Sequence, residues 1–159
     1  MSSIHQFSVK GISGDTIQFA DFKGKKILVV NVASECGYTP QYQQLQELYE
    51  EFHHKLEIIG FPSNDFGGQE PGTSVEIQAF CQTRFGVTFP LAEKVNIKGE
   101  HPHPVYQWLT QEAQNGLANH EVKWNFHKFF LDEEGQIIAS FPSSVSPFDD
   151  RILEALADN

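Results

Sequence analysis

One stretch constrains the fold more than any other: Lys26-Ile-Leu-Val-Val-Asn-Val-Ala33. Consecutive apolar, largely β-branched positions are typical of a strand covered on both faces, because a strand with one wet face alternates apolar and polar residues. An amphipathic helix pattern follows over residues 42–52, and a second apolar strand pattern covers residues 56–61. The order strand, helix, strand predicts a right-handed βαβ unit.

The remaining patterns complete a single domain over residues 1–159. Thr73-Ser-Val-Glu76 predicts the capping box of a second helix, with Cys81 on its apolar stripe. The other expected elements are a hairpin over 7–23, a short helix over 105–111, antiparallel strands over 126–131 and 136–141, and a last helix beginning at Ser146-Pro147. We therefore expect an α/β fold with a central mixed sheet flanked by helices and an N-terminal β-hairpin.

Charge and hydropathy exclude several classes of function. The chain has 11 basic and 21 acidic residues, which give a net charge of −10. Such a balance argues against binding to nucleic acid or to an anionic membrane, since both need basic surface. We also see no signal peptide and no apolar run long enough to cross a bilayer. The sequence therefore predicts a cytoplasmic protein with no integral membrane segment.

Two cysteines, Cys36 and Cys81, are too few for a disulfide-rich scaffold or an all-cysteine metal cage. They leave an inert pair, a structural bridge or a redox pair as alternatives. The histidines in His53-His54 and His101-Pro-His103 lack cysteine or carboxylate partners at a convincing spacing, so we expect no metal site.

Cys36 has the position of a reactive thiol. It follows the buried strand and precedes Thr39-Pro40, which we expect to begin a helix with Thr39 as the N-cap. The positive end of that helix would favour the thiolate over the thiol. Thr39 stands where the second cysteine of a C-x-x-C motif would be. The motif therefore lacks the second thiol that disulfide exchange within it would need. A single thiolate suits attack on a peroxide, although Cys36 read alone is also compatible with a small apolar residue.

Three segments together resemble the glutathione peroxidase family over essentially the whole chain. They are Asn31-Val-Ala-Ser-Glu-Cys-Gly-Tyr-Thr39, Phe61-Pro-Ser-Asn-Asp-Phe-Gly-Gly-Gln-Glu-Pro71 and Trp124-Asn-Phe-His-Lys-Phe-Phe130. The resemblance implies a thioredoxin-like fold and the reduction of hydrogen peroxide and organic or lipid hydroperoxides. It also implies four catalytic residues, namely Cys36 as the peroxidatic residue with Gln69, Trp124 and Asn125.

The three partner side chains are chemically suited to that role. An amide or indole N–H can hold a thiolate without neutralising it, and can stabilise the oxygen that leaves from a peroxide. The sequence departs from the family's frequent Phe-Pro-Cys-Asn-Gln at Ser63 and Asp65, where we expect little catalytic consequence. We expect Asp65 and Glu70 to be solvated loop residues and not an acid/base pair.

The resemblance also implies how Cys36 is reduced. Many cysteine-type members form an internal disulfide that thioredoxin reduces, and Cys81 lies in the matching region, one residue earlier than in plant-like members. The alternatives are a buried structural Cys81 with direct reduction by glutathione, a peroxide sensor that oxidises a partner protein, and a binding module with an inert thiol.

No prosthetic group is implied. The short segment between Gly99 and Val122 resembles that of members forming a monomer or a weak dimer.

Overall fold

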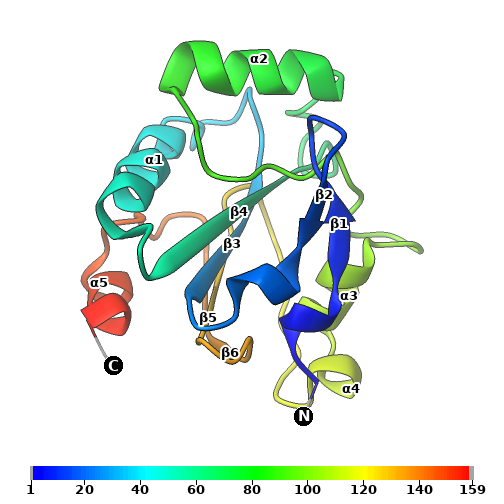
Figure 1. The fold of residues 1–159 in the computed structure, drawn as a ribbon. Coiled ribbons are helices and arrows are strands. Elements are labelled where there is room, and N and C mark those ends of the chain that lie inside the picture. Colours follow the sequence, from blue (N-terminus) through cyan, green and yellow to red (C-terminus); the bar gives the residue numbers. More distant parts are fainter. Residues whose placement is uncertain (1, 158–159) are drawn as a thin grey trace.

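The computed structural model describes residues 2–157 (Figure 1). Its helices and strands follow the predicted order, with three short helical segments that the sequence pattern did not indicate, η1, η2 and α4. The elements are η1 (Ile4–Gln6), β1 (Ser8–Lys10), β2 (Thr16–Gln18), η2 (Phe19–Phe22), β3 (Lys26–Val32), α1 (Gln41–Phe52), β4 (Leu56–Pro62), α2 (Ser74–Phe85), α3 (Pro104–Thr110), α4 (Glu112–Asn115), β5 (Lys128–Leu131), β6 (Ile137–Phe141) and α5 (Asp150–Ala157).

The main sheet has four strands in the order β4-β3-β5-β6. Strand β3 is parallel to β4 and antiparallel to β5, and β5 is antiparallel to β6. Strands β1 and β2 form a separate antiparallel hairpin. The predicted mixed sheet and N-terminal hairpin are both confirmed.

Both faces of β3 are covered, which explains why this strand is apolar at nearly every position. Leu28 and Val30 belong to a core that also contains Leu45 of α1, while Ile27 and Val29 belong to a second core that contains Trp108 of α3. Figure 1 shows α1 and α5 on one side of the sheet, and α3 with the hairpin on the other. Each fully buried aliphatic side chain contributes about 2 kcal/mol of stabilisation.

The capping box predicted for α2 is confirmed. The Thr73 hydroxyl accepts a hydrogen bond from the Glu76 N–H at 3.2 Å, and the Glu76 carboxylate accepts one from the Thr73 N–H at 3.0 Å. Gly86 ends the helix with a φ of 58°, a left-handed conformation that glycine adopts without a steric penalty. The capping box and Gly86 together set the bounds of α2, the helix that carries Cys81.

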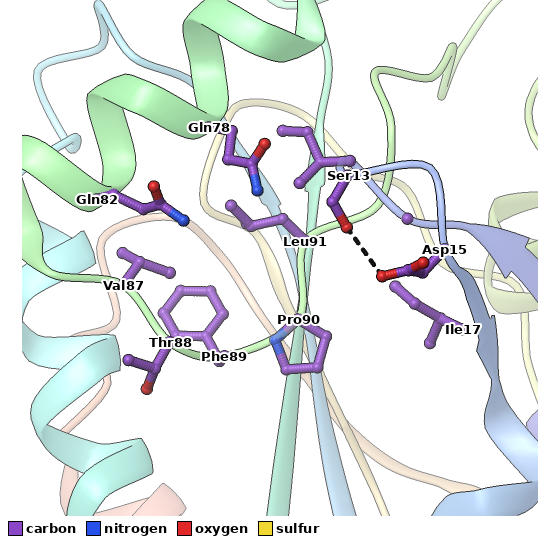
Figure 2. Close-up of a pocket in the computed structure, with 12 residues that line it drawn as sticks. Ser13, Asp15, Ile17, Gln78, Gln82, Val87, Thr88, Phe89, Pro90 and Leu91 are labelled. Carbon is purple, nitrogen blue, oxygen red and sulfur yellow. Dashed lines mark hydrogen bonds between the residues drawn. The ribbon is translucent and has the colours of Figure 1, made fainter.

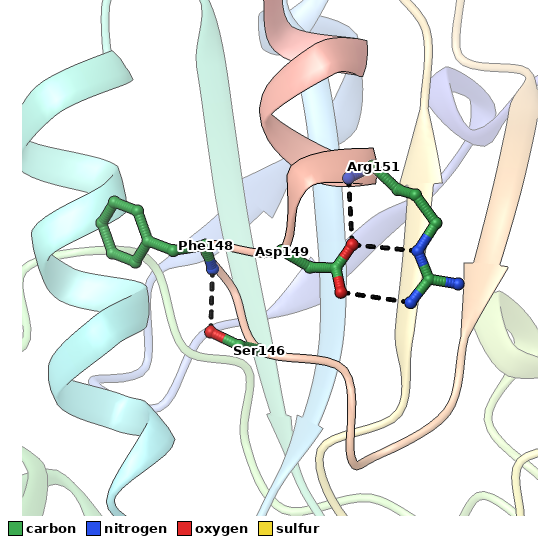
Figure 3. Close-up of polar contacts among 4 residues, drawn as sticks. All are labelled: Ser146, Phe148, Asp149 and Arg151. Atoms are coloured by element: carbon green, nitrogen blue, oxygen red, sulfur yellow. Dashed lines mark hydrogen bonds and ion pairs between the residues drawn. The ribbon is translucent and has the colours of Figure 1, made fainter.

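The last helix begins later than predicted, at Asp150 instead of Ser146-Pro147. Ser146 accepts a hydrogen bond from the Phe148 N–H at 3.1 Å, so its hydroxyl closes a turn before the helix. Asp149 is the residue that caps α5, because its Oδ1 accepts from the Arg151 N–H at 2.9 Å (Figure 3). The same carboxylate accepts from Nε and Nη2 of the Arg151 guanidinium.

This cap makes a pH-dependent contribution to stability. Hydrogen bonds from Arg151 lower the pKa of the Asp149 carboxyl to about 2, compared with about 4 in an unfolded chain. Because the folded pKa is depressed, the stabilisation is present above about pH 4 and is lost as the pH falls through about 2. In urea unfolding, Asp149→Asn is expected to be less stable than wild type at pH 6, with the gap closing towards pH 2. A gap that does not change with pH would contradict this assignment.

Candidate active site

Cys36 lies in a tight turn just after β3, with 7% of its surface exposed. Its own N–H donates to Thr39 Oγ1 at 2.9 Å, and the Thr39 hydroxyl donates to the Ala33 carbonyl at 2.8 Å. The Tyr38 N–H donates to Cys36 Sγ at 3.3 Å. The turn therefore directs a backbone N–H at the sulfur of Cys36.

The helix predicted to begin at Thr39-Pro40, with Thr39 as the N-cap, begins one residue later. Helix α1 begins at Gln41, and its N-cap, Pro40, has no side chain that can accept a hydrogen bond. The Thr39 hydroxyl is occupied by the turn around Cys36 and does not cap the helix. Thr39, at the second place of the C-x-x-C pattern, therefore serves to hold the cysteine loop in shape.

Gln69 is brought beside the Cys36 turn by a loop that follows β4. Its backbone carbonyl accepts a hydrogen bond from the N–H of Glu35, the residue that precedes Cys36, at 3.0 Å. The loop reaches this position through Gly67 and Gly68, which have φ values of 73° and 62°. Two consecutive left-handed residues explain the glycine pair in this loop.

Trp124 and Asn125 contact the same loop from the other side. The Asn125 side chain is fully buried, and its Nδ2 donates to Gln69 Oε1 and to the Phe66 carbonyl, both at 3.1 Å. Trp124 packs edge-on against Phe66, with ring centroids 6.4 Å apart. A Cβ at Gly67 would lie 2.6 Å from the Trp124 ring, so this close approach also requires glycine.

The structure thus joins Gln69, Trp124 and Asn125 in one cluster and links that cluster to the Cys36 turn through Glu35. Asn125 uses the carbonyl oxygen of the Gln69 amide, which leaves the Gln69 NH₂ group available to donate elsewhere. Trp124 is 36% exposed. The arrangement gathers neutral donors at one end of the sheet, with solvent access through the indole side.

Cys81 is fully buried on α2 and belongs to the same apolar core as Cys36. Burial, with a smaller contribution from the charge of Glu70, raises the pKa of its thiol to about 11, although the neighbouring Tyr42 hydroxyl acts in the opposite direction. Cys81 is therefore a thiol at neutral pH. Both cysteines are free, and Cys81 lies on the predicted apolar stripe together with Ile77.

The expectation that Asp65 and Glu70 are solvated is wrong. Glu70 is 1% exposed, and burial raises the pKa of its carboxyl. Asp65 is half-buried, and its Oδ2 accepts from the N–H groups of Ile97 and Lys98 at 2.6 and 3.1 Å. Segments that are distant in the sequence pack against both carboxylates. The local loop pattern could not predict this packing.

Two small pockets adjoin the candidate residues. One of about 230 Å³ is lined by Trp124, His127 and Pro142 among others. The other, of about 190 Å³, is bordered by three carboxylates, those of Glu35, Glu70 and Glu76. A separate pocket of about 390 Å³ lies between the β1–β2 hairpin and α2, where Gln78 and Gln82 reach towards the 87–91 segment (Figure 2). Its lining contains none of the four candidate catalytic residues.

The strand predicted to begin at Phe126 begins at Lys128 instead. Phe126 has a φ of 65°, a left-handed value that a strand cannot accommodate.

Lys128 is completely buried, and burial lowers the pKa of its ammonium to about 7. Asn31 in β3 is also completely buried. The sequence motifs gave no separate role to Lys128 or Asn31. Both are polar residues within otherwise apolar strands, and this is the sequence feature that could have indicated a role for them.

Within residues 2–157, no three histidine, cysteine or carboxylate side chains are grouped as ligands for a metal ion. Over the same residues, no helix is long and apolar enough to cross a membrane.

Comparisons with known proteins point to one family. The family model for glutathione peroxidase matches residues 4–110. The glutathione peroxidase homolog BsaA of Staphylococcus epidermidis is 45% identical over 148 residues, which cover 92% of this chain and 93% of the relative. The hydroperoxy fatty acid reductase gpx1 of a Synechocystis species is also 45% identical, over 92% of this chain and 90% of its own.

Solved structures support the same assignment. The crystal structure of Trgpx in apo form superposes with a TM-score of 0.74 at 34% identity, covering 99% of this chain and 97% of the other. A thioredoxin family thiol:disulfide interchange protein from Chlorobium tepidum shares the fold, with a TM-score of 0.63 at 19% identity, covering 98% of this chain and 94% of the other. The predicted thioredoxin-like fold is confirmed. The chain belongs to the glutathione peroxidase family and is a peroxidase.

Proposed function

We propose that this protein reduces hydroperoxides with Cys36 as the nucleophile. The observation that carries the proposal is the cluster of neutral donors from Gln69, Trp124 and Asn125, which is joined to the Cys36 turn by the bond between Glu35 and Gln69. A thiolate beside neutral donors keeps its charge and its nucleophilicity.

The proposed reaction has one chemical step at Cys36. The Cys36 thiolate attacks one peroxide oxygen, so an S–O bond forms while the O–O bond breaks. Cys36 is oxidised to a sulfenic acid, and the second oxygen leaves as hydroxide or alkoxide and takes up a proton. Gln69, Trp124 and Asn125 then act as an oxyanion site for the leaving oxygen.

We propose hydrogen peroxide and organic hydroperoxides, including those of lipids, as substrates. One relative is named a hydroperoxy fatty acid reductase. Trp124, which is partly exposed, and the adjoining pocket lined by Pro142 provide an open, partly apolar approach for a bulky substrate.

For recycling we propose thioredoxin, acting on a disulfide between Cys36 and Cys81. Both thiols belong to the same apolar core. Glutathione carries more carboxylates than amines, and the pocket beside the cysteine loop is bordered by Glu35, Glu70 and Glu76. Repulsion between like charges therefore disfavours direct reduction by glutathione.

The test is peroxide consumption by the wild-type protein in NADPH-coupled thioredoxin and glutathione systems. Turnover with thioredoxin is expected to exceed turnover with glutathione, and the glutathione rate is expected to rise with added salt because salt screens the repulsion. Faster turnover with glutathione at low salt would overturn the choice of reductant. Failure of the protein to consume peroxide with either system would instead favour a sensor.

We further propose that the protein is a monomer or a weak dimer in the cytoplasm. The segment 99–122 holds only the short helices α3 and α4, with no long insertion that could build a tetramer contact. Two free cysteines suit a reducing compartment. Gel filtration at micromolar concentration tests the oligomeric state.

A further inference from the structure

Asn31 makes three contacts with the loop that carries Trp124 and Asn125. Its Nδ2 donates to the Trp124 carbonyl at 2.9 Å, and its Oδ1 accepts from the His127 N–H at 3.0 Å. The backbone carbonyl of Asn31 accepts from the Phe126 N–H at 2.6 Å. One residue of the central strand β3 therefore binds the backbone on both sides of Asn125.

Lys128 binds a further backbone group of this turn. Its Nζ donates to the Phe126 carbonyl at 2.7 Å and lies 3.4 Å from the Ser143 carbonyl as a second acceptor. Phe126 is the residue with a φ of 65°, and among residues 2–157 it is the only non-glycine with a positive φ. Its ring is packed edge-on against Tyr42, with centroids 5.4 Å apart. The strained turn is thus fixed by a hydrogen bond at each peptide group and by its ring.

We propose that Asn31 and Lys128 are positioning residues for the peroxidase reaction. They fix the backbone on either side of Asn125, so that the amide of Asn125 and the indole of Trp124 are held where the leaving oxygen develops its charge. The proposal rests on the proposed function, because it assigns a role to residues that act through Asn125 and Trp124.

The physical basis is the rigidity of the supporting strands. Asn31 and Lys128 belong to β3 and β5, which pair with each other in the middle of the sheet, and both side chains are inaccessible to water. Water cannot replace a hydrogen bond lost there, so the freed peptide groups must find new partners by moving. A displacement of about 1 Å in a catalytic donor can lower a rate about a hundredfold.

Asn115 offers a matched control. It is also fully buried, its Nδ2 donates to the carbonyl of the other tryptophan, Trp108, at 2.8 Å, and its Oδ1 accepts from the Leu117 N–H at 2.7 Å. Its amide bridges a tryptophan carbonyl and a loop N–H as Asn31 does, at the end of α4. Asn115 makes two further side-chain hydrogen bonds, with the carbonyl and the N–H of Ala118. Asn115→Ser therefore removes more buried contacts than Asn31→Ser does, but only Asn31 lies beside the candidate site.

The measurement is the ratio of two second-order rate constants of Cys36, one with hydrogen peroxide and one with iodoacetamide. Alkylation has no leaving peroxide oxygen, so this ratio reports the oxyanion site, while a general loss of folding exposes the thiol to both reagents. Cys81→Ser serves as the background, so that one thiol reacts. The ratio is expected to fall about tenfold or more in Asn31→Ser and in Lys128→Met, and to stay within about twofold in Asn115→Ser.

An unchanged ratio in a folded Asn31→Ser or Lys128→Met overturns the positioning role. If neither variant folds, amide hydrogen exchange of the wild type decides. The N–H groups of Phe126 and His127 are expected to be as protected as those of β3, and exchange at the rate of exposed loops overturns the proposal. If the parent protein itself reacts with peroxide no faster than a small free thiol does, the proposed function fails, whatever the variants show.

Discussion

Replacing Cys36 by serine is expected to abolish peroxide turnover with either thioredoxin or glutathione as the reductant. A serine hydroxyl is not ionised at neutral pH and cannot be oxidised to the equivalent of a sulfenic acid, so the first step has no nucleophile. We expect a loss of at least about a thousandfold, in keeping with removal of the nucleophile in other enzymes. The coupled assays described above measure the rate.

The variant is expected to remain folded. The hydrogen bond made by Cys36 Sγ is the one accepted from the Tyr38 N–H, and a serine oxygen can accept the same bond. Thermal unfolding followed by circular dichroism checks this point. Cys81→Ser is the matched control, since it should be oxidised by one equivalent of peroxide at the wild-type rate. Turnover retained by Cys36→Ser would mean that another group carries the reaction.

Replacing Cys81 by serine is expected to remove most of the thioredoxin-linked turnover, about tenfold or more, while the first oxidation of Cys36 is unchanged. Without Cys81 the sulfenic acid has no internal thiol with which to condense, and thioredoxin meets a sulfenic acid in place of a disulfide. Mass spectrometry after one equivalent of peroxide should show a Cys36–Cys81 disulfide in the wild type. Unchanged turnover would remove Cys81 from the mechanism.

The burial of Cys81 adds a pH dependence to the same step. Because burial raises the pKa of the Cys81 thiol to about 11, the thiolate fraction in the closed fold rises with pH throughout the neutral and alkaline range. Disulfide formation in a single turnover is therefore expected to accelerate between pH 7 and pH 9. A flat profile would show that opening of α2 is the slow event.

Most of the elements could be predicted from the sequence because their cause is local. The capping box at Thr73 and Glu76 and the alternating packing of β3 depend on residues that are neighbours in the chain or on opposite faces of one strand. Helix starts were less predictable. Thr39 and Ser146 both have a hydroxyl that could cap a helix, but in each case the hydroxyl takes part in a turn that precedes the helix. The preference of Thr and Ser for N-cap positions does not tell a cap from such a turn.

The candidate catalytic residues were chosen from motifs, and the structure shows how three of them meet. Gln69 and Asn125 are 56 positions apart, yet their side chains are hydrogen-bonded. No local pattern predicts that bond, since it exists only once β4 and β5 lie in the same sheet. The burial of Glu70, which we expected to be solvated, has the same origin.

The sequence by itself determined that this chain forms an α/β sheet with a thiol at the end of its central strand, because apolar runs, caps and motifs act over a few residues. Only the tertiary structure decided how the loop that carries Trp124 and Asn125 is held in place. Asn31 is hydrogen-bonded to a loop 93 positions away in the sequence. Lys128 stabilises a left-handed turn at Phe126, where the sequence pattern predicted a strand. Buried hydrogen bonds between distant segments form only when the whole sheet has assembled, and for that reason they leave no periodic trace in the sequence.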